Sequence, residues 1–106
     1  MRIGLIGGVQ RMEPHYERLA KAAGHEVVFH DGHLRGGGGG ALTEFIDRCD
    51  VVVVLTDVNS HAAVQVARRH LRDHGRTPLL VRKFGLSRFG ALLAAVDAKT
   101  ALERAS

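Results

Sequence analysis

The chain has few of the residues that build disulfide-stapled, membrane-spanning or aromatic-rich proteins. Its 106 residues include no tryptophan, one tyrosine, one cysteine and two prolines. The single Cys49 cannot form an internal disulfide, and we predict that it is a small apolar filler of the core. No run approaches the roughly 20 apolar residues that cross a bilayer. Because the first apolar run starts at residue 2 and leaves no room for a signal peptide, we expect a cytoplasmic location.

Four short apolar runs alternate with four helical patterns. The runs cover residues 2–7, 25–29, 50–55 and 78–81, and the third is rich in valine. Such runs are typical of strands buried on both faces of a parallel sheet. Apolar residues recur at helical spacing over residues 13–23, 42–46, 62–74 and 86–105. The alternation predicts one α/β domain over residues 1–106, with a four-stranded parallel sheet in the order 2-1-3-4 flanked by helices.

This topology brings four polar segments to one edge of the sheet, formed by the carboxyl ends of the strands. We call this edge the rim. The segments are Gly7-Gly8, His30–His33, Thr56–His61 and Arg82–Gly85, and Arg11, His15 and Tyr16 follow shortly after the first. Ligands of open parallel sheets bind outside the carboxyl ends of the strands. The rim is therefore the predicted binding site.

The net charge of +4 makes nucleic acid a partner to consider. The basic residues are spread along the chain, and no aromatic side chains alternate with them to stack on bases. We therefore consider nucleic acid an unlikely partner. We interpret Arg68, Arg69 and Arg72 as a solvated helix face. The basic side chains of Arg82, Lys83 and Arg88 are better explained by a small anion bound at the rim.

Glycines are concentrated in two places. Gly4, Gly7 and Gly8 do not have the G-x-G-x-x-G spacing of a dinucleotide site, so a tight turn is favoured over a phosphate cradle, although Gly8 and Arg11 could still contact an anion. Residues 36–40 are five consecutive glycines, which lack a Cβ and are costly to order. We give equal weight to a simple surface connection and to a lid beside the rim.

The seven histidines divide into two groups. His70 and His74 lie four residues apart near a helix end, where surface capping is the favoured role, and His25 is predicted to be exposed at the opposite edge of the sheet. His15, His30, His33 and His61 all fall at or just after the end of a strand, where they could share one cavity.

Several kinds of chemistry could use these four histidines. A zinc ion would need Asp31 or Asp57 to complete its ligands, because the rim has no thiolate. Hydrolysis by Ser60 with His61 is disfavoured, since adjacent residues cannot easily aim at each other. Haem needs only one or two imidazoles, an apolar slot and cations for its propionates. Solvent-facing loop histidines with no ligand remain the alternative. The slot would come from Phe29, Leu34, Val58, Phe84 and Leu86, and the cations from Arg11, Arg82, Lys83 and Arg88.

The order of these motifs resembles a bacterial family known as domain of unknown function 2325. The matching segments are Gly7-Gly8, Pro14-His15-Tyr16, His30-Asp31-Gly32, Asp50 before the valine run, Thr56-Asp57 and Ser60-His61. The resemblance covers about residues 2–93 and implies a small Rossmann-like domain whose rim histidines are functional. It also brings an association with haem binding. The chain departs from the family at Val58-Asn59, where a cysteine is common, and in its pentaglycine.

We therefore predict a haem-binding protein that holds haem b through histidine. The iron ligands are ranked His61, His30, His15 and His33, and the cofactor would also contact Gly8, Arg11, Tyr16, Arg82, Lys83 and Arg88. The alternatives are a site for a divalent transition metal, small anion or nucleotide, or a regulatory interaction domain without a cofactor. Because a porphyrin is large for this domain and the last helix is apolar on several sides, we expect a homodimer or larger homo-oligomer.

Overall fold

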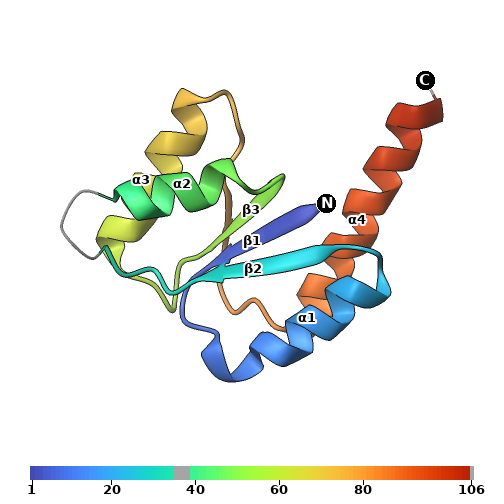
Figure 1. The fold of residues 1–106 in the computed structure, drawn as a ribbon, viewed down its shortest axis with the longest axis horizontal. Coiled ribbons are helices and arrows are strands. Elements are labelled where there is room, and N and C mark those ends of the chain that lie inside the picture. The colour runs from blue at the N-terminus through green and yellow to red at the C-terminus, as the bar shows by residue number, and fades with distance from the viewer. Residues whose placement is uncertain (35–38, 106) are drawn as a thin grey trace.

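A computed structural model describes residues 1–34 and 39–105 and confirms the predicted architecture. A four-stranded parallel sheet has the order β2-β1-β3-β4, with helices on both faces (Figure 1). The strands are β1 (Arg2–Ile6), β2 (Glu26–His30), β3 (Val51–Leu55) and β4 (Leu79–Val81). The helices are a 3₁₀ turn η1 (Gln10–Met12), α1 (Glu13–Ala22), α2 (Gly40–Asp47), α3 (His61–Asp73) and α4 (Leu86–Ala105).

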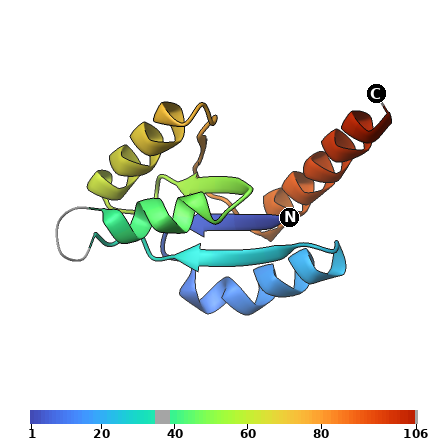
Figure 2. The same ribbon diagram turned by 45° about the horizontal axis from the view of Figure 1, so that its top comes forward.

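The sheet separates two apolar cores. Ile3 and Leu5 of β1 face α1 and α4, whereas Ile6 faces α2 and α3, as alternation along a strand requires. Figure 2 shows α2 and α3 together on the opposite side of the sheet from α1. Every histidine on these elements is therefore assigned to one face or the other.

Close packing at the centre explains one glycine and the cysteine. A Cβ at Gly4 would lie 2.6 Å from Sγ of Cys49 and 3.0 Å from the ring of Phe45, so a larger residue would push α2 away from β1. Cys49 is only 5% exposed, and burial raises the pKa of its thiol. These observations confirm the prediction that Cys49 is a small core residue.

Two predictions about individual segments have different outcomes. The expected exposure of His25 is wrong: only 9% of its side chain is accessible. Its Nδ1 lies 3.0 Å from the Met1 amino group, and its Nε2 lies 2.6 Å from the Asp97 carboxylate. Residues 36–38 of the predicted glycine lid lie outside the described residues, and the last two glycines lead into α2.

The longest helix, α4, extends well beyond the sheet (Figure 1). Only Phe89 and Leu93 of this helix are buried, and Leu102 near its end is 72% exposed. Within residues 1–34 and 39–105, no helix is both long enough and apolar enough to span a membrane.

Candidate functional site

The first turn of the rim is closed by its own hydrogen bonds. The backbone N–H groups of Gly7, Gly8 and Val9 donate to the carbonyls of His30 (2.8 Å), Val58 (2.8 Å) and Gly7 (3.1 Å). These three amides are therefore engaged within the protein rather than pointing at a ligand. A Cβ at Gly7 would also lie 2.9 Å from Leu55, at a φ of 146° that favours glycine. The turn packs strands together, in agreement with the favoured interpretation of these glycines.

Asn59 and Ser60 join three strand ends. The Asn59 amide Nδ2 donates to the Ile6 carbonyl at 3.1 Å. The Ser60 hydroxyl donates to the Gly32 carbonyl at 2.7 Å and accepts the Ala63 N–H at 3.1 Å, which caps α3. Because both capacities of the hydroxyl are used in this way, Ser60 serves the structure of the rim.

The loop that follows β4 is held by residues from other elements. Lys83 has a left-handed backbone (φ 50°), which is uncommon for a residue with a side chain, and its N–H donates to the Asp57 carboxylate at 2.9 Å. The Tyr16 hydroxyl donates to the Phe84 carbonyl at 2.7 Å. Tyr16 is 3% exposed, and burial raises its pKa. Strained residues that are fixed in this way are frequent at functional sites.

These contacts shape a pocket of about 360 Å³ between the loops that follow β1, β3 and β4. It contains three of the predicted cofactor-binding residues, Gly8, Tyr16 and Lys83. Arg11, Arg82 and Arg88 are exposed outside its lining, and Arg88 donates to the Arg82 carbonyl at 3.0 Å. Its lining is Gly8, Val9, Met12, Tyr16, Leu55, Asp57, Val58, Lys83, Phe84 and Gly85. We call it the rim pocket.

The four predicted iron ligands are divided by the sheet. His15 is exposed on α1, and its Nδ1 lies 2.8 Å from the Arg18 guanidinium. His30 packs edge-on against Phe45 of α2, on the other face. His33 is exposed after the β2 turn, and His61 is exposed at the first position of α3. None of the four lines the rim pocket.

Hydrogen bonding distinguishes His30 from His61 as ligands. Nδ1 of His30 accepts the Gly32 N–H at 3.0 Å, so the proton of its neutral ring lies on Nε2. Nε2 of His61 lies 3.0 Å from the side-chain amide nitrogen of Gln65, which can only donate. The neutral His61 ring therefore accepts a hydrogen bond at Nε2, at the exposed first position of α3.

A second groove lies beside His61. Gln65, Arg68 and Arg72 follow His61 at intervals of four, seven and eleven residues, a spacing that places all four on one face of α3. The groove has a volume of about 590 Å³ and is lined by Leu34, Ala62, Gln65, Val66, Arg68, Arg69 and Arg72. We call it the α3 groove. Arg68, Arg69 and Arg72 are all exposed, as expected for a solvated helix face, and they also line this groove.

A protein metal site usually needs several donor side chains that point at one place. Among the residues that the structure describes, no group of three or more His, Cys, Asp or Glu side chains is placed to hold a metal ion. A tetrahedral zinc site built from Asp31 or Asp57 and the rim histidines therefore has no support from the arrangement of these side chains. His61 is an exposed imidazole at the start of α3.

The fold defines a small Rossmann-like α/β domain. Residues 2–96 match the model of a family described as an uncharacterized protein conserved in bacteria (DUF2325), and the chain belongs to this family. A UPF0751 protein of Bacillus cereus strain AH820 is 36% identical over 76 residues, which are 72% of this chain and 75% of that protein. A UPF0751 protein of Bacillus anthracis strain CDC 684 is 34% identical over the same shares. No solved structure matches the chain.

Proposed function

We propose that this protein binds haem in the α3 groove, with His61 as the iron ligand. The observation that supports this most directly is that His61 lies on the same face of α3 as Gln65, Arg68 and Arg72, which line the α3 groove together with Leu34 and Val66. Haem requires an imidazole, an apolar surface for the macrocycle and cations for its propionates. The α3 groove offers apolar surface and cations, and His61 directly precedes Ala62 of its lining, although neither this lining nor that of the rim pocket includes a histidine.

The residues of the α3 groove fit the cofactor. Leu34, Ala62 and Val66 supply apolar surface, and His33, the fourth-ranked ligand, directly precedes Leu34. Arg68 lies seven residues after His61, about 10 Å along the helix axis at 1.5 Å per residue. We infer that Arg68 would reach the propionates of a haem held by His61. Arg69 and Arg72 widen the positive surface on the same side.

Haem bound here would supply a redox-active iron. The chain's own contribution is to hold and orient. His61 follows Ser60, the capping residue, so its backbone is fixed to the Gly32 turn through the Ser60 hydroxyl. The groove is open to solvent on one side, and a second copy of the chain would cover an exposed macrocycle. We therefore keep a homo-oligomer as part of the proposal.

Haem titration with visible absorption tests the site. The wild type is expected to develop a Soret band, and His61→Ala to lose or shift it. His74→Ala is the matched control, because His74 lies on α3 but its Nδ1 donates to the His70 carbonyl at 2.8 Å, away from the groove. Absence of a Soret band in the wild type, or an unchanged band in His61→Ala, would contradict the proposal.

Substitutions of basic residues test whether haem binds in the α3 groove or in the rim pocket. Arg68→Gln with Arg72→Gln is expected to weaken haem binding several-fold, whereas Arg48→Gln, an exposed arginine beyond α2, is the control and should leave it unchanged. Lys83→Met tests the rim pocket. Weaker binding in Lys83→Met with normal binding in the double arginine variant would move haem to the rim pocket and overturn the assignment to the α3 groove.

A further inference from the structure

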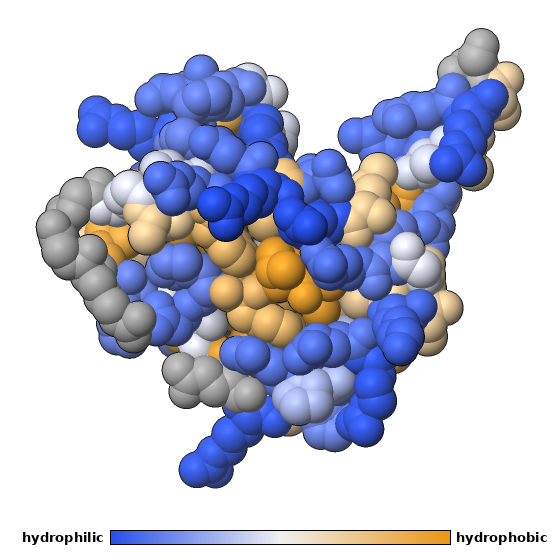
Figure 3. All heavy atoms as spheres, in the orientation of Figure 1, coloured by the Kyte–Doolittle hydropathy of each residue, from blue (hydrophilic) through white to orange (hydrophobic). Residues whose placement is uncertain are grey.

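A third hollow lies at the other end of the sheet, between β3, β4 and α4. It arises because β4 pairs only with Val53–Leu55, so the first half of β3 has no strand beside it on that side. Figure 3 shows apolar surface in the space between α3 and α4. The hollow has a volume of about 470 Å³, within the range of small-molecule sites. We call it the α4 cleft.

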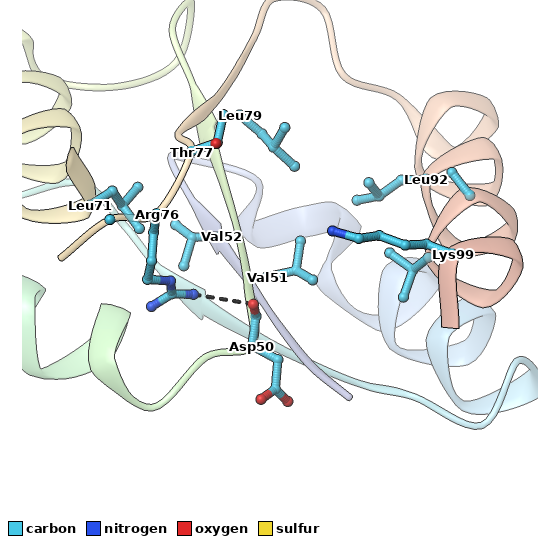
Figure 4. A pocket seen from close by; sticks show the side chains of 12 residues that line it. Asp50, Val51, Val52, Leu71, Arg76, Thr77, Leu79, Leu92 and Lys99 are labelled. Atoms are coloured by element: carbon cyan, nitrogen blue, oxygen red, sulfur yellow. Dashed lines mark hydrogen bonds between the residues drawn. The ribbon is translucent and has the colours of Figure 1, made fainter. Parts of the chain in front are cut away.

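The walls of the α4 cleft are apolar and come from both sides. Val51 and Leu79 line it from the strands, and Leu92 and Val96 line it from α4 (Figure 4). Leu79 is 36% exposed, and its side chain forms part of the wall of the cleft. An apolar ligand body would cover this surface.

The charges at the mouth of the α4 cleft are positive. Lys99 is exposed, and Figure 4 shows its side chain reaching from α4 toward Val51. Arg76 forms a fixed wall, because its guanidinium donates to the carbonyls of Ile46 (3.1 Å), Cys49 (2.7 Å) and Asp50 (3.2 Å). The Asp50 carboxylate points away from the cleft and accepts the Arg2 N–H at 2.7 Å. Asp50 is the acidic residue among those that line the cleft, and its carboxylate is directed away from Lys99.

We propose that the α4 cleft binds a small amphipathic carboxylate, with the apolar body against Val51, Leu79 and Val96 and the carboxylate on Lys99. Apolar burial drives the binding, and the ammonium group selects an anionic head over a neutral one. The site is independent of the haem proposal, since the α4 cleft contains no histidine and lies away from the rim. Lys99 lies beyond residues 2–96, which match the family model. The preference for an anionic ligand is therefore proposed for this chain.

The probe is 2-naphthoate, with the neutral 2-naphthylmethanol as its partner, in an NMR titration of the ¹⁵N-labelled full chain. We expect saturable shifts of the amides of Val51, Thr77 and Leu79, and several-fold tighter binding of the carboxylate than of the alcohol. Lys99→Met is expected to remove that preference. Lys21→Met, an exposed lysine on α1, is its control and should retain it.

A blocking substitution tests the location. Ala95 lines the α4 cleft and is exposed, so Ala95→Phe is expected to fill the cleft and abolish binding while the protein stays folded. Ala94→Phe adds the same ring at a neighbouring exposed position outside the lining and should leave binding intact. Shifts spread over the whole surface, equal binding of both probes, or undiminished binding in Ala95→Phe would each overturn the proposal. Haem titration of Ala95→Phe should still give the wild-type Soret band.

Discussion

Replacing Gly32 by alanine tests the junction that joins the strand ends of the rim. Gly32 has a φ of 83°, in the left-handed region that costs an L-residue about 1–2 kcal/mol. Its Cβ would lie 2.0 Å from Oδ1 of Asn59, so the Asn59 side chain must rotate away. That rotation breaks the bond from Nδ2 to the Ile6 carbonyl and displaces a half-buried amide, a loss of about 1–2 kcal/mol. We expect Gly32→Ala to lower the free energy of unfolding by about 2–4 kcal/mol.

Urea unfolding followed by circular dichroism gives this quantity, and the chain contains a matched control. Gly75 ends the turn after α3 with a similar φ of 69°, but nothing lies within 4 Å of the position where its Cβ would be. Gly75→Ala therefore isolates the backbone strain and should cost about 1–2 kcal/mol.

A double variant isolates the collision with Asn59. In an Asn59→Ala background the side chain that Gly32→Ala would strike is absent. The cost of Gly32→Ala should then fall to that of Gly75→Ala, which gives a coupling energy of about 1–2 kcal/mol. Equal costs for Gly32→Ala and Gly75→Ala in the wild type, or a cost of Gly32→Ala unaffected by Asn59→Ala, would refute the reasoning.

Three further predictions concern hydrogen bonding and titration. Tyr16→Phe should lower the unfolding free energy by about 1 kcal/mol in urea, because it removes only the bond to the Phe84 carbonyl; no change would contradict that bond. Because burial raises the pKa of Cys49, its contribution to stability is full below the ordinary thiol pKa and falls as the pH rises above it. Tyr16→Phe removes the other buried group that titrates at alkaline pH. In that background the urea midpoint should fall as the pH rises, and adding Cys49→Ala should abolish the part of this fall that is due to the thiol. The His70 hydrogen bond lowers the pKa of Asp47, so its contribution is present above the ordinary carboxyl pKa and lost in acid; wild type and Asp47→Asn should converge at low pH in urea midpoints.

The strands and helices, and from their alternation the sheet order, could be predicted because each element depends mainly on residues that are close together in the sequence. A run such as 51–55 contains only β-branched and aliphatic residues, and such a run is stable when both faces are covered. Gly24 and Gly75 follow helical patterns and adopt φ values of 79° and 69°, as helix-ending glycines do. Ser60 lies just before a helical pattern and caps α3, as serine commonly does in that position.

The environment of His25 could not be predicted, because its partners are remote. Asp97 is 72 residues away on α4, and the Met1 amino group reaches the ring across the start of the sheet. A window of neighbouring residues shows only that His25 precedes a strand. Long-range pairs of this kind depend on where α4 crosses the sheet, and the apolar residues around α4 allow several angles.

The arrangement of the candidate ligands was partly accessible, and it changes which experiment matters. Ile6 pairs with His30 in the sheet, so the two side chains share the α2 and α3 face, whereas His15 is on α1 against the other face. Being at the ends of neighbouring strands is therefore insufficient for four histidines to meet. A residue that begins a helix differs, because the helix itself extends the site along its axis. From His61, α3 presents Gln65, Arg68 and Arg72 in sequence, and this continuity makes His61→Ala the variant whose Soret band decides the proposal.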